Sequence, residues 1–264
     1  MSSVPIPAEP AAEEPSDDAV LGGRLRLQQP RRGHRIGHDA ILLAAACPAR
    51  AGERLVELGA GVGAAGLALA LRVEGTQMTL IEIDAELAAL AQENARRNGL
   101  AARVSTVVLD AAAPARAFAA VGLEPESVMR VLMNPPFNDP GRHRPSPDRR
   151  RRLAHAGAAA TLPTWIRAAA RLLRPHGTLT MIWRAAGLAD VLRALDAAFG
   201  AVAVLPVYPK PAAPAVRILV RATKASRAPF TLLPGLVLND RAGVPTAESL
   251  SVLRRGTALP LADV

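Results

Sequence analysis

The sequence predicts an α/β fold in which seven strands form a mostly parallel, doubly wound sheet whose last strand is antiparallel. From Arg54 onward, short aliphatic runs alternate with helical patterns, as in strands joined by crossover helices. The strands are nearly continuous apolar runs, which is typical of a parallel sheet covered on both faces. The connection 208–215 has eight residues with three prolines, too few for a helical crossover, so the last two strands should pair antiparallel.

The expected elements follow the chain in order. The strands are Arg54–Leu58, Met78–Ile83, Val104–Leu109, Val128–Met133, Thr178–Trp183, Ala201–Val207 and Val216–Ala222. The helices are Ala64–Arg72, Glu86–Asn98, Ala111–Val121, Leu162–Leu173 and Leu188–Phe199. Asp84 is a residue type that caps a helix N-terminus, and Gly99 can end that helix after Asn98.

Composition divides the chain into four segments. Residues 1–20 hold five acids, no base and no hydrophobic periodicity, which predicts a disordered acidic tail. Residues 53–225 contain the alternating pattern and form the main domain, preceded by residues 21–52. Residues 226–264 are a shorter, loop-rich C-terminal extension. Because half of all residues are hydrophobic, the domain can fill a sizeable core.

Several classes of protein are excluded by what the sequence lacks. Cys47 is the sole cysteine, which excludes an internal disulfide framework and a multi-cysteine metal site, and we expect no metal. No uncharged stretch reaches the roughly 20 apolar residues of a membrane helix. The start has neither the basic nor the apolar region of a secretory signal. We therefore expect a cytoplasmic protein without membrane association, and nothing in the sequence indicates its oligomeric state.

The chain is basic, with a net charge of +9 from 32 basic and 23 acidic residues. This balance favours a polyanionic partner such as nucleic acid. The alternative is that abundant arginine and alanine reflect a GC-rich genome. Total charge alone does not separate the two interpretations.

A glycine-rich turn follows the first strand of the alternating pattern. Its glycines, Gly59, Gly61 and Gly63, let the backbone approach a ligand where a Cβ would clash. The spacing fits both G-x-G-x-G and G-x-G-x-x-G, so alone it leaves a nicotinamide cofactor and S-adenosylmethionine open. Glu57 favours S-adenosylmethionine, because an acid can face its methionine ammonium but would repel a pyrophosphate.

Two further acids lie at the ends of the next two strands. Glu82 lies about 20 residues after the turn, where a carboxylate can accept both ribose hydroxyls of a nucleoside cofactor. We assign Glu82 to the ribose and Asp84 to the helix cap. Asp110 follows the third strand and could accept the adenine amino group, although an acid at this place is as often a turn former.

The most specific motif is Asn134-Pro135-Pro136-Phe137, directly after the fourth strand. The two prolines remove backbone donors and leave carbonyls free to accept hydrogen bonds. The Asn134 oxygen and the Pro135 carbonyl can therefore hold the two hydrogens of a planar amino group and aim its lone pair at a methyl donor. Phe137 offers a stacking face for a base taken out of its stack.

On these motifs the chain resembles the class I S-adenosylmethionine-dependent methyltransferases, which have a Rossmann-like fold, and among them the amino-methylating group with Asn-Pro-Pro-Phe or Asn-Pro-Pro-Tyr. More narrowly, it is similar to the bacterial tRNA1(Val) adenine-N6 methyltransferase family. That family carries a Gln-Pro-x-x-Gly-x-Arg-x-Gly-x-Asp-Ala segment, which residues 29–40 match. The resemblance covers about residues 24–260.

The resemblance implies that residues 21–52 form a lid over the cofactor. Gln29, Arg35 and Asp39 are then candidate cofactor contacts. A capped helix beginning at Asp39 is an equally good interpretation of the same segment.

Arginines are concentrated just after the Asn-Pro-Pro-Phe motif. They are Arg142, Arg144, Arg149, Arg150, Arg151 and Arg152. A basic loop at the mouth of the site can hold phosphates and steer RNA. The alternative is the solvated start of a helix, and the position of the cluster favours RNA contact.

Together these observations predict S-adenosylmethionine-dependent N6-adenine methylation of RNA, with tRNA as the expected substrate. Protein glutamine-N5 methylation uses the same geometry, but that branch usually has Tyr where this chain has Phe137. A non-catalytic RNA-binding module would need neither the intact turn nor Asn134. A nicotinamide oxidoreductase would explain neither Asn-Pro-Pro-Phe nor the reversed last strand.

Overall fold

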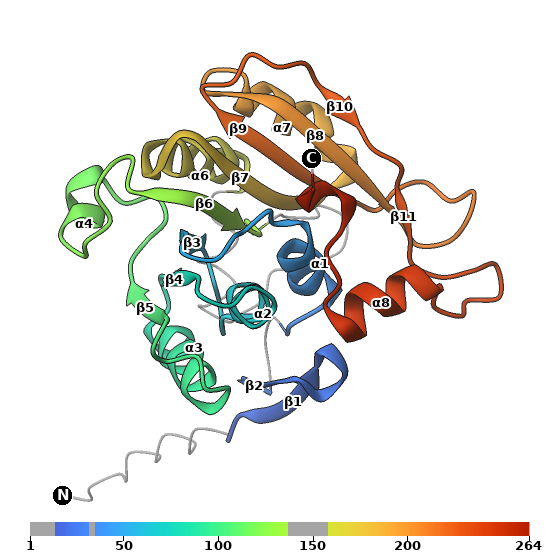
Figure 1. The fold of residues 1–264 in the computed structure, drawn as a ribbon, viewed down its shortest axis with the longest axis horizontal. Helices are drawn as coiled ribbons and strands as arrows, with labels where there is room; N and C mark the ends of the chain where they lie inside the picture. The colour runs from blue at the N-terminus through green and yellow to red at the C-terminus, as the bar shows by residue number, and fades with distance from the viewer. Residues whose placement is uncertain (1–13, 32–34, 137–157, 264) are drawn as a thin grey trace, which may run out of the picture.

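The computed structural model describes residues 14–31, 35–136 and 158–263. Helices pack on both faces of one central sheet, and a small hairpin lies beside it (Figure 1). No helix within these ranges has the length and apolar character needed to cross a membrane.

Nine strands form the central sheet, in the spatial order β10-β8-β9-β7-β6-β3-β4-β5, with β11 also pairing with β8. The strands of the parallel part are β3 (Arg54–Leu58), β4 (Gln77–Glu82), β5 (Val104–Val108), β6 (Val128–Met133) and β7 (Leu173–Arg184). Next come β9 (Arg217–Lys224), which is antiparallel to both of its neighbours, and β8 (Phe199–Tyr208). The expected parallel sheet with a reversed last strand is confirmed.

The sheet has two strands more than the seven expected. β10 (Thr231–Leu232) and β11 (Leu236–Val237) come from the C-terminal extension and pair parallel with β8. Each has only two residues, so no periodicity marks it in the sequence. The rest of the extension contains α8 (Ala247–Arg255) and the 3-10 helix η3 (Pro260–Ala262).

The apolar side chains of the sheet contribute to two clusters, one under each helical layer. The first layer consists of α1 (His38–Ala46), α2 (Ala64–Arg72) and α3 (Ala85–Arg97). The second consists of α4 (Ala115–Ala119), α6 (Ala158–Leu172) and α7 (Leu188–Leu195), the last preceded by the 3-10 helix η2 (Ala185–Gly187). On β3, Leu55 packs in the first cluster, whereas Val56 and Leu58 pack in the second. Burial on both faces explains the continuous apolar strands.

Two helices are shorter than expected, α4 at its start and α7 at its end. α4 begins only at Ala115, because Asp110 turns the chain and Pro114 takes the N-cap position. α7 ends at Leu195, and Phe199 instead begins β8.

The expected ends of α3 are confirmed. The side chain of Asp84 accepts hydrogen bonds from the backbone N–H groups of Glu86 and Leu87, which satisfies two donors of the first turn. After Asn98, Gly99 has φ +70°, a conformation that glycine adopts without the strain of a Cβ.

The predicted disordered tail is wrong for its last residues. β1 (Ser16–Val20) pairs antiparallel with β2 (Leu25–Gln29) through the 3-10 helix η1 (Leu21–Gly23), whereas residues 1–13 lie outside the described ranges. Hydrogen bonds from Arg97 and Arg26 lower the pKa of Asp17. The acids of this strand are thus partnered by arginines distant in sequence, which the local pattern of the tail does not show.

A buried ion pair joins β6 to the residue that precedes β3. Arg130 donates from Nε and Nη2 to the two carboxylate oxygens of Glu53, at 2.9 and 2.6 Å. Its Nη1 donates to Thr178 Oγ1 at 3.1 Å. The Arg130 and Glu53 side chains are 10% and 14% exposed, so removing either partner leaves the other charge uncompensated in the interior.

We therefore expect Glu53→Ala to lower the free energy of unfolding by about 3–5 kcal/mol. The control is Glu93→Ala, which breaks the exposed pair with Arg96 and should cost about 1 kcal/mol or less. Urea denaturation of the two variants measures the difference. Equal losses would show that the Arg130–Glu53 pair contributes no more than a surface pair.

Candidate active site

The carboxyl ends of β6, β3, β4 and β5 bring the predicted site residues to one edge of the sheet. Leu58 pairs with Met133 and with Ile81, so the residues that follow these three lie at the same level. They are Gly59, Asn134 and Glu82. Asp110 follows β5 at the same edge. Ligands of open α/β sheets bind at this edge, so the arrangement forms a coherent candidate site.

The glycine turn has a left-handed backbone at three positions. Gly59, Gly61 and Gly63 have φ of +70°, +56° and +85°. A Cβ on Gly59 would collide with the indole of Trp165 on α6. Among the residues that the structure describes, no atom lies within 4 Å of a Cβ placed on Gly61. The apex of the turn is therefore bare backbone facing open space.

Glu82 holds this turn to the end of β4. Its Oε2 accepts a hydrogen bond from Gly61 N–H at 2.7 Å, and its Oε1 accepts one from Asp84 N–H at 3.0 Å. The neighbouring Ile83 is 53% exposed, and this apolar surface beside the carboxylate was not expected from the sequence. The sequence placed Ile83 inside the expected strand Met78–Ile83, whereas β4 ends at Glu82 and leaves Ile83 just outside it.

Glu57 lies beneath the turn, only 3% exposed. Its Oε2 accepts a hydrogen bond of 2.7 Å from Gly66 N–H in the first turn of α2. Burial raises the pKa of Glu57 to about 8; the hydrogen bond from Gly66 opposes this shift, and the nearby charge of Glu82 adds to it. The described contact of Glu57 is thus with α2, and its role toward a methionine ammonium stays a prediction.

Asn134 stands half-buried directly after β6, followed by the buried Pro135 and the half-buried Pro136. The Asn134 Oδ1 atom is buried and accepts no hydrogen bond from the described part of the chain. A buried acceptor without a donor is unfavourable, and a ligand N–H would satisfy it. Phe137 and the six loop arginines lie outside the described residues.

The candidate contacts of the N-terminal segment have partners within the protein. Gln29 Nε2 donates to Asp18 Oδ2 at 2.7 Å, and its Oε1 accepts from Ile36 N–H at 2.9 Å. Arg35 also binds Asp18, with distances of 2.9 and 3.0 Å to the two oxygens. Asp18 lies in the part of the chain expected to be a disordered tail, so this organising residue was missed.

Two other predicted cofactor contacts also bond within the chain. Asp39, in the first turn of α1, pairs with Arg217 at the start of β9 with an Nε–Oδ2 distance of 2.9 Å. Asp110 is exposed, and its Oδ1 accepts from Ala112 N–H at 2.8 Å, as in a turn former. The cofactor roles of both remain predictions.

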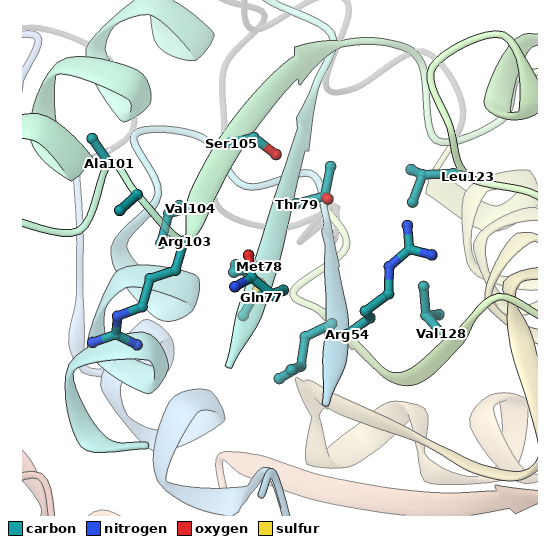
Figure 2. A pocket seen from close by; sticks show the side chains of 12 residues that line it. Arg54, Gln77, Met78, Thr79, Ala101, Arg103, Val104, Ser105, Leu123 and Val128 are labelled. Carbon is teal, nitrogen blue, oxygen red and sulfur yellow. The ribbon is translucent and has the colours of Figure 1, made fainter. Parts of the chain in front are cut away.

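A cavity of about 240 Å³ lies at the opposite edge, where β3, β4 and β5 begin (Figure 2). Its lining includes Arg54, Arg103, Thr79 and Ser105. Figure 2 shows the guanidinium groups of Arg54 and Arg103 pointing away from each other. Because its charged groups do not converge, this cavity is not the candidate site.

Within the described ranges, no cluster of three or more His, Cys, Asp or Glu side chains could hold a metal ion.

The strand order, the glycine turn and the Asn-Pro-Pro segment at the carboxyl edge define a class I methyltransferase, a class whose cofactor is S-adenosylmethionine. The sequence model of the methyltransferase small domain family matches residues 34–207, and the chain belongs to that family.

Relatives of this chain include tRNA1(Val) (adenine(37)-N6)-methyltransferases. That of Tolumonas auensis is 28% identical over 160 residues, which are 60% of this chain and 63% of the relative. That of Enterobacter sp. (strain 638) is 31% identical over 152 residues, 56% of this chain and 58% of the relative. The chain thus spans about three fifths of the length of these relatives.

Solved structures show the same fold. A predicted O-methyltransferase, protein Atu636 from Agrobacterium tumefaciens, has a TM-score of 0.71 and 29% identity, covering 84% of this chain and 98% of that one. TrmN from Thermus thermophilus has a TM-score of 0.51 and 21% identity, covering 70% of this chain and 48% of that one. The second likeness shows the fold alone.

The buried Glu57 predicts a pH-dependent stability. Between pH 4.5 and about 8, the unfolded state loses the Glu57 proton while the folded state keeps it, so rising pH favours unfolding. Glu57→Gln removes this effect. The unfolding free energy of Glu57→Gln minus that of the parent should rise from pH 5 to 8 and then level off. The total rise should be at most about 5 kcal/mol.

Denaturation with urea at several pH values measures this difference. The control is Glu93→Gln, because a hydrogen bond from Arg96 lowers the pKa of the exposed Glu93 carboxyl. Glu93 is thus ionised in both states above pH 5, and the control difference should stay constant. A flat Glu57→Gln difference would mean that Glu57 is already ionised in the folded protein at pH 5.

Proposed function

We propose that this protein transfers a methyl group from S-adenosylmethionine to the exocyclic N6 amine of adenine in RNA, with tRNA as the expected substrate. The observation that carries the proposal is the buried Asn134 Oδ1, which lacks a donor among the described residues and stands beside the glycine turn. It is followed by two prolines without backbone N–H groups.

The cofactor fits the edge formed by the turn and the end of β4. The space at Gly61 admits a ligand against bare backbone. Glu82 already accepts two backbone N–H groups, but each carboxylate oxygen has a further lone pair with which to accept a ribose hydroxyl. Ile83 offers an apolar face for the base, and Asp110 an acceptor for its amino group. When bound here, S-adenosylmethionine supplies an electrophilic methyl group.

The residues after β6 orient the accepting amine. Asn134 Oδ1 accepts one amino hydrogen and the Pro135 carbonyl accepts the other, which holds the nitrogen lone pair toward the methyl carbon. A C–N bond then forms as the C–S bond breaks, and the product ammonium loses its extra proton to water. The attack needs no general base, because the amine is neutral before it attacks. Phe137 stacks on the extruded base.

Three observations support RNA as the substrate class. The chain has a net charge of +9, six arginines follow Phe137 closely, and several relatives are named tRNA methyltransferases. Glutamine-amide methylation in proteins and binding of RNA without catalysis are the competing functions. Residues 21–52 cover the cofactor in this proposal. The Asp39–Arg217 ion pair fastens them at the carboxyl edge of the sheet.

Asn134→Ala should lower single-turnover methyl transfer by about 100-fold or more, because its hydrogen bond strengthens as the amine becomes positive. RNA affinity should remain nearly unchanged. The substrate for this measurement is found by incubating the protein and labelled S-adenosylmethionine with total RNA and, separately, total protein.

Label in RNA as N6-methyladenine, abolished in Asn134→Ala, is the expected result. Label in glutamine side chains of protein would establish the competing enzyme. Tight RNA binding without label in either fraction would establish the binding module. Transfer by Asn134→Ala at the parent rate would contradict the orienting mechanism.

The loop arginines should make RNA binding salt-dependent. Replacing Arg149 to Arg152 by Ala should flatten the log–log dependence of affinity on salt by about 0.7–0.9 for each phosphate that the variant no longer neutralises. The control replaces the exposed Arg96 on α3 and Arg193 on α7, which should leave the slope unchanged. Filter binding at several salt concentrations measures the slopes of both variants and of the parent. If the loop variant had the same slope as the parent, the loop arginines would be solvated surface residues that do not contact RNA.

A further inference from the structure

Two asparagines, Asn94 in α3 and Asn98 at its C-cap, bind the backbone of β2 as a neighbouring strand would. Asn98 accepts from Arg26 N–H through Oδ1 at 3.0 Å and donates from Nδ2 to Arg26 O at 2.7 Å. Asn94 makes the same pair with Gln28, at 2.7 and 3.0 Å. The asparagines are one helical turn apart and the two strand residues alternate along one edge, so the spacings match. β2 thereby pairs with β1 on one edge and with α3 on the other (Figure 1).

The second donor bond distinguishes the two asparagines. Asn94 Nδ2 also donates to Val62 O at 3.0 Å, and Val62 lies between Gly61 and Gly63 in the turn. Asn98 instead donates to Asn94 O at 2.7 Å, within its own helix. One amide therefore bonds to both the hairpin and the glycine turn, whereas its neighbour bonds to the hairpin alone.

The Asn94 side chain is inaccessible to solvent, so water cannot replace its hydrogen bonds. Asn94 is 0% exposed, and both of its N–H groups are used. Its removal would leave Val62 O and the Gln28 backbone groups without these partners. The turn is sensitive to such a change because the apex at Gly61 has no side chain to pack and is held by hydrogen bonds, including that of Gly61 N–H to Glu82.

We propose that Asn94 is a positioning residue that couples the N-terminal hairpin (β1–η1–β2) to the glycine turn, so that a docked hairpin fixes the turn in the geometry that receives S-adenosylmethionine. The part concerning the cofactor rests on the proposed function. The coupling itself is a property of the protein without ligand, and it follows from the shared amide.

Asn94→Ala and Asn98→Ala form a matched pair for the test. Both remove an amide that pairs with β2, and only the first removes the bond to Val62. Hydrogen–deuterium exchange of the ligand-free protein should become faster over residues 25–29 in both variants. Over residues 60–66 it should become faster in Asn94→Ala alone, by about tenfold.

Calorimetric titration with S-adenosylhomocysteine gives the second readout. Asn94→Ala should weaken binding by about tenfold, and Asn98→Ala by no more than about threefold, at temperatures where both are fully folded. Should Asn94→Ala not fold, Asn94→Ser, whose hydroxyl cannot reach both segments, takes its place in both measurements.

Unchanged exchange over residues 60–66 in the Asn94 variant would overturn the coupling, as would an equal acceleration there in Asn98→Ala. Faster exchange with unchanged affinity would overturn the positioning role. If the parent protein bound no S-adenosylhomocysteine, the cofactor assignment would fail, while the exchange measurement would still decide the coupling.

Discussion

A backbone that turns through three left-handed glycines links β3 to α2, and it constrains the side chains that hold it at the carboxyl edge of the sheet. No described side chain stabilises this turn from the open side at Gly61, where the proposed function places S-adenosylmethionine. Its stability therefore comes from below and from the flanks. Glu82 accepts Gly61 N–H, Glu57 accepts Gly66 N–H, and Trp165 closes against Gly59.

Two carboxyl groups thus share the task of holding the backbone in a low-dielectric environment. Glu57 accepts the Gly66 N–H and Glu82 accepts the Gly61 N–H. Burial, and to a smaller extent the nearby charge of Glu82, disfavours ionised Glu57 and raises its pKa to about 8. A cationic cofactor would relieve this cost. Under the proposed function, the carboxyl groups that shape the turn are therefore ones whose ionised form a cationic cofactor would favour.

Much of the fold was predictable because its determinants are local in sequence. Continuous apolar runs indicated the parallel strands, and the proline-rich connection indicated the reversed one. The strand-end site residues followed from the same topology. The strand at Ser16–Val20 was missed because its acids find arginines as distant as Arg97, and β10 and β11 were missed because two residues carry no period. Asn94 had one sign in the sequence: it is a weak helix former inside α3, four residues before the C-cap asparagine Asn98.

The N-terminal segment bonds to elements on both sides of the candidate site, and this gives it a physical role that its sequence alone does not show. On one side, Asn94 joins β2 to the glycine turn. On the other, the Asp39–Arg217 pair joins α1 to β9, whose neighbour β7 lies beside β6, the strand before Asn134. Between these points Gln29 bonds to Asp18 and to Ile36 N–H, so the hairpin is fastened to the start of α1. Because these bonds form a chain, displacement of the hairpin would disturb the turn and the accepting edge together.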